Sequence, residues 1–345
     1  MRRGWIGLVL LAGLATSVTG CQSPGGGSSD SSQTGTGSSL EDDYQSTVKS
    51  VLPSIVQINT ADGLGSGVVY DDDGHIVTNA HVVGDATSFQ VTPAAGGDSV
   101  RASLVAAYPP DDLAVIKVDS TSDFAVDPAV FADSGDVRVG DMVLAMGNPL
   151  GLTGSVSEGI VSSVGRTVSE PGSKETDATT IADMIQTTAS INPGNSGGAL
   201  VNLSNKVVGI PTLGAVNPDL GNSAAPGIGF AISANTATRI VDQIVDSGKV
   251  TDSDRATLGI QTRQMVDADL NPAGIGVVKV DKGGSGDEAG IEAGDVIVQL
   301  GDTGVDSISQ LNDYLASKRP GQKVTVTVQR GDAEKRLKAT LDERR

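Results

Sequence analysis

The chain has 345 residues, a single cysteine, two histidines and a formal net charge of −18. One cysteine excludes an intrachain disulfide framework, and so few cysteines and histidines exclude zinc clusters of the finger type. The acidic balance argues against nucleic acid as a partner, because affinity for phosphates depends on Lys and Arg. Its length predicts about two domains, and its 45 glycines with few aromatic residues favour a turn-rich β protein over a helical bundle.

The first residues have the anatomy of an export signal. A basic start precedes an apolar stretch over 4–18, which is shorter than a membrane span of about 20 residues. Cys21, the only cysteine, ends the sequence Ser-Val-Thr-Gly-Cys, which resembles a bacterial lipobox. We therefore predict a lipoprotein signal peptide over 1–20 and a lipid anchor on Cys21. A plain secretory signal with an incidental cysteine is the alternative.

The next segment is rich in Gly, Ser and Thr. Residues 22–40 contain almost no apolar side chain, so they cannot bury enough surface to offset the chain entropy lost on folding. We predict a flexible tether over 21–43 with a mean reach of roughly 25 Å. A folded body held off a membrane, outside the cytoplasm, is the expected arrangement.

From residue 44 onward, short apolar runs alternate with turns, which predicts β-strands. The strands are expected at 54–59, 66–70, 75–79, 88–92, 113–118, 142–146, 159–164, 206–211 and 228–232. Apolar residues at helical spacing over 235–247 predict a closing helix. Many short strands at this spacing are typical of barrels or a sandwich, so 44–247 is expected to form one mostly β domain.

A polar stretch over 248–256 indicates a linker to a second unit over 257–345. Strands are expected near 259–263, 276–280, 295–300 and 324–329, with a helix near 308–317. This mixture of strands with one helix predicts a small α+β domain.

Three segments of the first domain carry residues typical of nucleophilic catalysis. Ser196 lies in Gly194-Asn195-Ser196-Gly197-Gly198, where glycines let the backbone turn so that its N–H groups can hold a developing oxyanion. His81 follows a predicted strand, and neutral imidazole is the usual base for a serine hydroxyl. Asp112 begins an apolar strand and can orient the imidazole, although Asp111 competes for this role. The order His, Asp, Ser is that of the chymotrypsin-like triad.

The other histidine, His75, is expected to be an exposed strand residue. Six residues of strand separate it from His81 by about 20 Å, so a zinc site formed by this pair is not expected, and no cofactor is predicted. For Ser196 by itself, a glycine turn without catalytic function is the alternative. The three segments together, in this order, disfavour that alternative.

With these residues the chain resembles the HtrA/DegP-type trypsin-like serine proteases that carry one C-terminal PDZ domain. The resemblance runs from about 44 to 341 and includes, beside the catalytic segments, the blocks 65–69, 138–149, 157–162 and 227–232. It implies a mostly β protein in which a chymotrypsin-like double β-barrel over 44–247 precedes an α+β PDZ domain. Ser196 is then the expected nucleophile, His81 the base and Asp112 the residue that orients His81.

The resemblance also implies an oxyanion hole and a substrate pocket. The N–H groups of Gly194 and Ser196 are expected to form the oxyanion hole, with Asn195 shaping the turn between them. The primary specificity pocket is expected to be lined by Ser190, Ile191, Thr212, Gly214, Gly227 and Ile228. None of these is acidic, so we expect cleavage after small or medium aliphatic residues rather than after Lys or Arg. A polar, mobile regulatory loop is expected over 168–180.

In the second unit, Leu258-Gly259-Ile260 resembles the carboxylate-binding loop of a permuted bacterial PDZ domain. The block 284–297 is the most specific part of this match. A PDZ groove adds a C-terminal peptide as an extra strand, and backbone N–H groups capture its carboxylate. A structural lid or spacer is the alternative for this domain. The family resemblance further implies a homotrimer built through a segment near 44–51.

Together these features predict a lipid-anchored, extracytoplasmic serine endopeptidase of the cell envelope. Its expected partners are misfolded or damaged envelope proteins and C-terminal peptides, with no nucleic acid. The alternative is a latent protease that acts mainly as a chaperone or peptide-binding scaffold. An intact triad argues against a dead scaffold.

Overall fold

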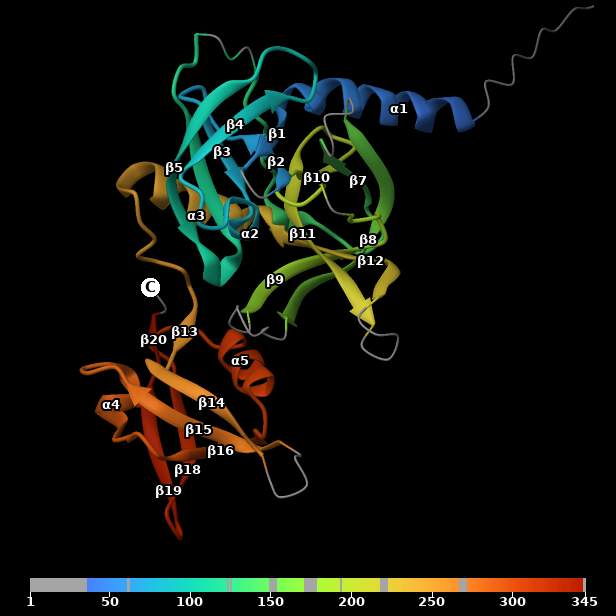
Figure 1. Cartoon of the computed structure of the whole chain (residues 1–345). Coiled ribbons are helices and arrows are strands. Elements are labelled where there is room, and N and C mark those ends of the chain that lie inside the picture. The colour runs from blue at the N-terminus through green and yellow to red at the C-terminus, as the bar shows by residue number, and fades with distance from the viewer. Residues whose placement is uncertain are drawn as a thin grey trace, which may run out of the picture.

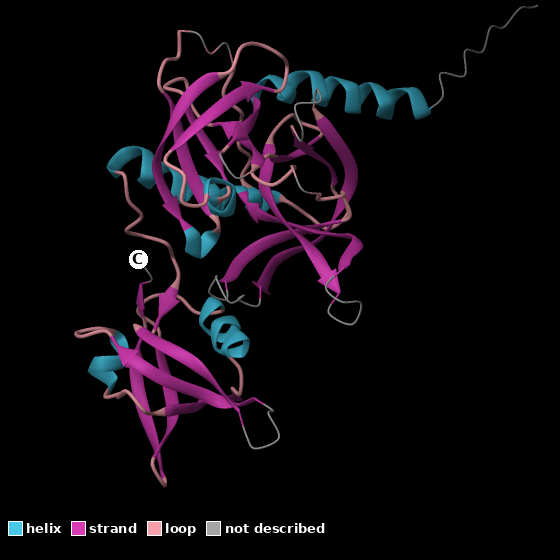
Figure 2. Ribbon diagram, viewed as in Figure 1, coloured by secondary structure: helices cyan, strands magenta, loops and turns pink. Residues whose placement is uncertain are grey.

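The computed structural model describes residues 36–60, 63–122, 124, 126–148, 154–170, 179–192, 194–217, 223–266 and 272–343. The predicted signal peptide, Cys21 and most of the predicted tether lie outside these residues. Within the described part of the chain, no helix is long and apolar enough to cross a membrane. Two β-barrels are followed by a smaller sheet with two short helices (Figures 1 and 2).

The first barrel closes in the order β1-β2-β3-β6-β5-β4. Its strands are β1 (Ile55–Asn59), β2 (Leu64–Val69), β3 (His75–Thr78), β4 (Ser88–Pro93), β5 (Val100–Tyr108) and β6 (Leu113–Val118). Two short elements interrupt the strands: helix α2 (Ala80–Val83) after β3, and the 3₁₀ turn η2 (Pro109–Asp111) before β6. These two elements bring His81 and Asp112 to one end of the barrel.

The second barrel closes in the order β10-β11-β12-β9-β8-β7. Its strands are β7 (Met142–Gly147), β8 (Ser155–Glu170), β9 (Thr179–Thr187), β10 (Ala199–Asn202), β11 (Val207–Asn217) and β12 (Ser223–Ser233). The turn η3 (Ser134–Asp136) precedes it, and helix α3 (Ala234–Ser247) follows it. The Ser233 hydroxyl caps α3 by accepting the Thr236 N–H, and Gly248 ends it at φ +71°.

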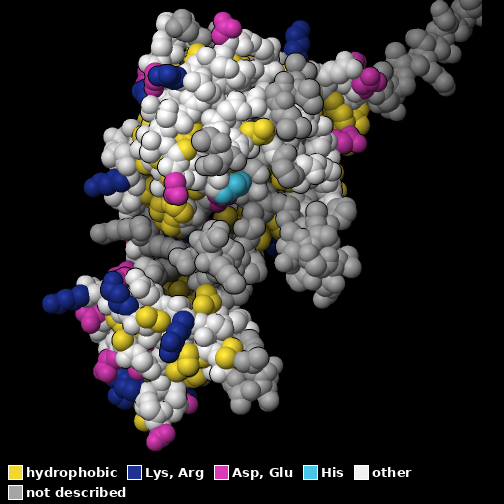
Figure 3. Space-filling model, in the orientation of Figure 1, with side chains coloured by type: hydrophobic (Ala, Val, Ile, Leu, Met, Phe, Trp, Pro, Cys, Tyr) yellow, Lys and Arg dark blue, Asp and Glu magenta, His cyan; other side chains and the backbone are white. Residues whose placement is uncertain are grey.

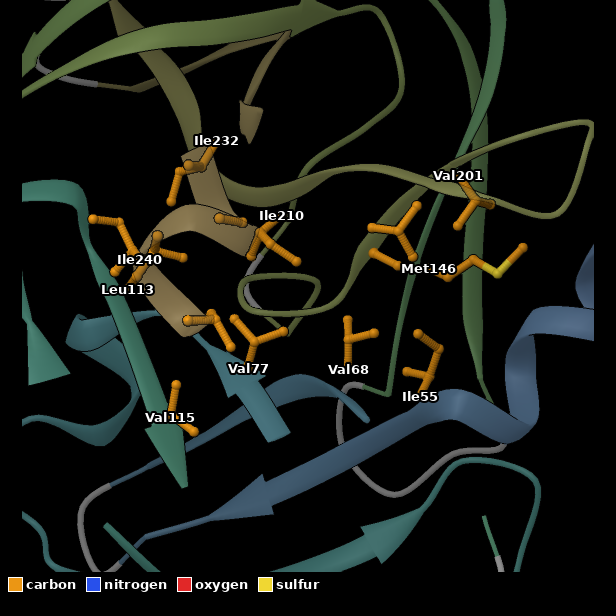
Figure 4. Close-up of a cluster of buried hydrophobic side chains, with 14 of the residues drawn as sticks. Ile55, Val68, Val77, Leu113, Val115, Met146, Val201, Ile210, Ile232 and Ile240 are labelled. Carbon is orange, nitrogen blue, oxygen red and sulfur yellow. The ribbon is translucent and has the colours of Figure 1, made fainter. Parts of the chain in front are cut away.

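The main core lies between the two barrels and under α3. Side chains from both barrels and from α3 converge there (Figure 4), including Ile55, Val77, Met146, Ile210 and Ile240, all fully buried. Burying an aliphatic side chain of this size stabilises the fold by roughly 1.5–3 kcal/mol. Because this cluster is shared, the barrels are packed as one body, and the segments that carry His81, Asp112 and Ser196 have a fixed separation.

The second unit is a sheet in the order β14-β15-β16-β18-β19, with β13 paired to β20. Its strands are β13 (Ala256–Thr257), β14 (Ile260–Val266), β15 (Pro272–Val280), β16 (Val296–Leu300), β17 (Thr303–Gly304), β18 (Lys323–Arg330), β19 (Ala333–Thr340) and β20 (Asp342–Glu343). Helices α4 (Ser285–Ala289) and α5 (Ile308–Ala316) flank it. Figure 1 shows α5 between this sheet and the ends of β8 and β9, with which it is in contact.

The predicted fold class is confirmed: the chain is mostly β, with a double barrel followed by a small α+β unit. The predicted strands are present within a few residues, and the closing helix begins one residue early, at Ala234. Three barrel strands, β5, β9 and β10, were not predicted. The strand β5, for example, reads VRASLVAAY and alternates its burial only in part, so its sequence gives a weak period-two signal.

The C-terminal limit of the predicted flexible tether, residue 43, was wrong, because the last part of that segment is helical. Helix α1 (Thr36–Val51) begins seven residues before that limit and leads into the turn η1 (Leu52–Ser54). Its C-terminal half is amphipathic: Thr47 and Val51 are buried, while Tyr44 and Val48 pack against the main core. Contact with the barrels therefore orders residues that a composition argument assigned to the tether.

Candidate active site

The three predicted catalytic residues come from different elements, and two of them, His81 and Ser196, line one cavity. His81 lies on α2, Asp112 follows η2, and Ser196 lies in the turn before β10. His81, Ser196 and Gly194 line a cavity of about 570 Å³. The His81 side chain is 48% exposed, and Figure 3 shows histidine atoms in cyan at the protein surface. A substrate in the cavity can therefore reach the imidazole.

The His81 imidazole is held by the Asp112 carboxylate. Nδ1 of His81 lies 2.8 Å from Oδ2 and 3.0 Å from Oδ1 of Asp112, and the backbone N–H of His81 donates to Oδ1 at 2.9 Å. Because a carboxylate only accepts hydrogen bonds, Nδ1 carries the proton and Nε2 presents its lone pair. This is the tautomer that a general base for serine requires.

Thr212 provides a further contact to Asp112 that sequence reasoning missed. Its hydroxyl donates to Oδ2 of Asp112, and its carbonyl accepts the Ser196 hydroxyl at 3.3 Å. The sequence analysis placed Thr212 only in the substrate pocket, whose cavity it does line. A hydroxyl 100 positions from its carboxylate partner leaves no spacing signal, so only the fold reveals this contact.

The turn that carries Ser196 has a defined geometry. The Asn195 N–H donates to the Asn192 carbonyl at 3.0 Å, and Gly194 has φ +109°. The sequence Asn-Pro-Gly-Asn favours a type II turn, which takes proline second and a residue of positive φ, usually glycine, third. A left-handed residue at 194 is therefore what the sequence favours, and glycine adopts that conformation without a steric cost.

The same turn is fastened to the first barrel. The Ser66 hydroxyl donates to the Gly194 carbonyl at 2.5 Å and accepts the Asn148 N–H at 2.8 Å. The Ser66 N–H also donates to the Ser196 carbonyl at 3.0 Å. Ser66 is fully buried, so these bonds are shielded from water. The backbone of the turn that carries Ser196 is therefore positioned by β2 as well as by its own barrel.

The predicted pocket residues lie on three segments that come together. Gly214 on β11 is paired with Gly229 on β12, which places Gly227 and Ile228 beside the same strand. A Cβ on Gly229 would lie 3.1 Å from the Ala189 carbonyl and would collide with the Ile191 side chain. The segment that contains Ser190 and Ile191 therefore rests on β12. Of the six predicted pocket residues, Ile191 and Thr212 line the same cavity as His81 and Ser196.

The structure distinguishes the two adjacent aspartates. Asp112 contacts His81, whereas Asp111 is fully buried and forms an ion pair with Arg255. Asp112 is therefore the carboxylate next to the imidazole. Asp111 has a different partner, which lies outside the barrels.

The expectation that His75 is exposed was wrong. His75 is 6% exposed, and its Nδ1 lies 2.7 Å from Oδ2 of Asp71. The turn Asp71-Asp72-Asp73-Gly74 folds back so that the Asp71 carboxylate also accepts the His75 N–H at 3.1 Å. A local carboxylate thus allows the imidazole to be buried in the barrel wall. Among the described residues, no group of three or more His, Cys, Asp or Glu could hold a metal ion.

The predicted PDZ loop borders a groove between β14 and α5. A cavity of about 170 Å³ there is lined on one side by Leu258 and Ile260 and on the other by Leu311 and Leu315. Gly259 has φ +61°, and its N–H donates to the Thr257 hydroxyl at 3.1 Å. Arg255 and Thr180 line the end of the groove that faces the second barrel. Two residues of the predicted carboxylate-binding loop, Leu258 and Ile260, therefore border this groove.

Comparison with known proteins agrees with both parts of the fold. A family model described as a trypsin-like peptidase domain matches residues 65–210, and a PDZ domain model matches residues 256–341. The chain is 38% identical over 295 residues to serine protease PepD of Mycobacterium tuberculosis, and the match covers 81% of the chain and 61% of that relative. It is 36% identical over 293 residues to serine protease Do-like HtrA of Lactococcus lactis subsp. lactis, and the match covers 79% of the chain and 70% of that relative.

A third relative, a probable periplasmic serine endoprotease DegP-like of Bartonella henselae, is 39% identical over 284 residues, and the match covers 81% of the chain and 53% of the relative. The chain thus spans between about half and two thirds of the length of several curated relatives.

Solved structures show the same architecture. The HtrA-type protease AlgW with decapeptide superposes with a TM-score of 0.58 at 28% identity, covering 88% of this chain and 99% of that one. The serine endoprotease from Yersinia pestis superposes with a TM-score of 0.57 at 31% identity, covering 88% and 98%. Both domains are matched in order, and His81, which Asp112 contacts, lines the same cavity as Ser196. The chain belongs to the HtrA/DegP family of trypsin-like serine proteases with a PDZ domain.

Proposed function

We propose that this protein is a serine endopeptidase with Ser196 as nucleophile, His81 as general base and Asp112 as the residue that orients His81. The observation that carries the proposal is the contact of 2.8 Å between Nδ1 of His81 and the Asp112 carboxylate, at the cavity that Ser196 also lines. Family membership supports it, since the relatives named above are serine proteases.

The mechanism follows from the direction of each hydrogen bond. Nε2 of His81 accepts the proton of Ser196 as Oγ attacks the scissile carbonyl, and the imidazolium that forms is stabilised by Asp112. The developing oxyanion accepts hydrogen bonds from the N–H groups of Gly194 and Ser196. His81 then donates its proton to the leaving amine, and a water repeats the sequence to release the acyl group. No step uses a metal or other cofactor.

We propose that the pocket selects small or medium aliphatic side chains before the scissile bond. Its proposed lining by Ser190, Ile191, Thr212, Gly214, Gly227 and Ile228 offers no carboxylate to pair with Lys or Arg. The packing of Ile191 on Gly229 adds apolar surface where the side chain would enter. Substrates are proposed to be misfolded or damaged envelope proteins, whose aliphatic residues are exposed.

For the PDZ unit, over 257–345, we propose a C-terminal peptide as ligand, held by the loop Leu258-Gly259-Ile260. The groove between β14 and α5 offers apolar walls on both sides, as side-chain pockets for an added strand require. The similar AlgW structure is described as carrying a decapeptide, which supports a peptide as the class of ligand. The residues between the two domains, 248–256, are proposed to be a linker.

We propose a homotrimer assembled near α1. Tyr44 on α1 contacts Met142 of β7, with its hydroxyl 4.0 Å from the sulfur. Around that contact, Met142, Ile160 and Val139 are 40%, 42% and 65% exposed. An apolar patch of this kind, beside an exposed helix, is typical of a protein–protein interface. A second copy of this chain is the occupant that the family resemblance favours.

An extracytoplasmic, lipid-anchored location is also proposed. The support is the signal-like sequence that ends at Cys21 and the description of one relative as periplasmic. The competing function, a latent protease that acts as a chaperone or binding scaffold, has less support because His81, Asp112 and Thr212 are already connected by hydrogen bonds.

The proposed activity is tested with a fluorophosphonate probe and casein. The wild-type chain is expected to react with the probe at Ser196 and to degrade casein, whereas Ser196→Ala should do neither while its PDZ unit still binds a C-terminal peptide. Casein degradation by Ser196→Ala at the wild-type rate would disprove the assignment. Failure of the wild-type chain to react, with and without peptide, would favour the scaffold.

A further inference from the structure

The residue before Asp112 takes part in an ion pair that the proposed mechanism does not use. Asp111 ends η2, its side chain is fully buried, and the guanidinium of Arg255 contacts its carboxylate. Arg255 is itself only 10% exposed, and it also donates to the Thr180 carbonyl of β9 at 2.6 Å. One guanidinium therefore connects η2 of the first barrel with β9 of the second.

The backbone of Asp112 depends on η2. Asp112 has φ +51°, a left-handed conformation that is unfavourable for a residue with a Cβ and persists only where its surroundings hold it. Its N–H donates to the Pro109 carbonyl at 3.0 Å, and its carbonyl accepts the Asn79 side chain at 2.9 Å. Asn79 holds Asp112 from the side of β3. On the other side, η2 is anchored through Asp111.

Arg255 lies outside the barrels, in the segment that leads into the PDZ unit. The N–H groups of Ser253 and Asp254 donate to the Glu343 carboxylate at 2.8 and 3.1 Å. The Asp254 carboxylate in turn pairs with Arg319 at 2.5 Å. The backbone that carries Arg255 is thus fixed by β20 and by the end of α5. The same segment is also held by α3 of the first domain, since Arg239 pairs with Asp254 at 3.5 Å and Gln243 accepts the Asp252 N–H at 2.8 Å. Contacts from both domains therefore position the guanidinium.

We propose that Arg255 is a positioning residue for the reaction: through Asp111 it holds the Asp112 carboxylate in line with His81. The inference rests on the proposed endopeptidase function. A buried carboxylate that loses its cationic partner is strongly unfavourable, so η2 must shift when Arg255 is removed. That shift moves Asp112, whereas the proposed substrate pocket is built from other segments. The effect therefore falls on kcat and leaves KM largely unchanged.

The test uses the full chain and a quenched fluorescent peptide. Arg255→Met is expected to lower kcat between about 10-fold and about 100-fold, the cost of a small misplacement, with KM changed by less than about 2-fold. Adding Asp111→Asn to Arg255→Met removes the buried charge that has lost Arg255 and should restore part of kcat, but not all of it, because the link between η2 and β9 is still missing. Arg255→Lys, which keeps the charge, should retain more activity than Arg255→Met. The matched control is Arg336→Met, which removes the exposed Arg336–Glu334 pair on β19 and should leave kcat unchanged.

The outcomes separate positioning from domain packing. Wild-type kcat in Arg255→Met overturns the inference, and so does an equal loss of kcat in the single and double variants at unchanged melting temperature. If Arg255→Met does not fold, Asp111→Asn decides: reduced kcat at unchanged KM supports the inference, and unchanged kcat overturns it. A wild-type chain that does not react with a fluorophosphonate overturns the proposed function as well, whereas a reactive wild type with unaffected variants overturns this inference alone.

Discussion

Replacing Asp112 with asparagine should remove most of the activity while keeping the fold. Asp112 accepts hydrogen bonds from three groups: the backbone N–H of His81, its Nδ1–H and the Thr212 hydroxyl. Asparagine has almost the same shape but only one carbonyl oxygen, and its NH₂ group must then face one of these donors. The group that can adapt is the imidazole, which moves its proton to Nε2 so that Nδ1 can accept.

The size of the effect follows from that change of tautomer. With the proton on Nε2, His81 cannot accept the proton of Ser196, and a triad with this defect loses about 10⁴-fold in kcat, or roughly 5.4 kcal/mol of transition-state stabilisation. The assay is kcat and KM on a fluorogenic peptide at neutral pH, beside a thermal melt. The melting temperature should change little, because the carboxylate is 12% exposed and the amide preserves its packing.

The chain provides a matched control for this variant. Asp71 forms the same kind of contact with His75, at 2.7 Å, in the hairpin turn between β2 and β3. Asp71→Asn should therefore leave kcat unchanged, although it removes an equivalent contact between carboxylate and imidazole. If Asp112→Asn keeps more than about a tenth of the wild-type kcat, or if Asp71→Asn loses as much, the proposed role of Asp112 is refuted.

Three further predictions follow from other contacts. Ser66→Ala should lower kcat by about 10-fold to 100-fold, measured with the same peptide, because the Gly194 carbonyl and the Asn148 N–H lose the hydroxyl that joins them; unchanged kcat would contradict the role given to the first barrel. Arg330→Met should destabilise the PDZ unit by about 3 kcal/mol in urea unfolding, since Asp295, 1% exposed, loses two hydrogen bonds. Burial raises the pKa of Asp295, but the hydrogen bonds from Arg330 and the Glu292 N–H lower it by more, so that the pKa lies below its ordinary 3.8. The stabilisation from Asp295 is therefore present above pH 3.8 and is lost as the pH falls through the folded-state pKa. A stability that does not change with pH in this range would contradict this. Cys21→Ser should move the protein from the membrane fraction to the soluble fraction, and continued sedimentation with membranes would argue against a lipid anchor.

The fold could be predicted, and catalytic roles for His81, Asp112 and Ser196 could be proposed, because their signals are local or ordered along the chain. Alternating apolar residues predict strands, and the nucleophile turn needs glycines at set positions, which the sequence shows directly. His75 could not be placed in the same way, since burial of an imidazole depends on a partner such as Asp71 and not on strand spacing. The start of α1 was missed for a related reason, because the residues that order it, Tyr44, Val48 and Val51, pack against a core to which both barrels contribute.

The contacts that sequence reasoning missed share one physical feature: each joins two residues that are more than 90 positions apart in the sequence. Thr212 and Arg255 reach Asp112 and Asp111 across the boundaries of barrels and domains, and neither contact has a fixed separation along the chain. Such residues look ordinary in the sequence: a threonine in a strand and an arginine in a polar linker. They are found only when the fold shows which buried carboxylates they serve.

The abundance of glycine, first interpreted as a sign of many turns, has a more specific meaning around Ser196. A Cβ on Gly147 would lie 2.7 Å from the Asn195 Cα, and one on Gly159 would lie 2.6 Å from the Ala189 Cα. A Cβ on Gly198 would lie 3.0 Å from the Asn195 carbonyl. These contacts are with backbone, which cannot rotate away as a side chain can. The strands β7 and β8 therefore approach the nucleophile segment more closely than any other residue type allows, and that approach lets one hydroxyl, Ser66, hold the turn from the opposite barrel. Glycine at these sites contributes to the alignment of the proposed catalytic residues rather than to flexibility.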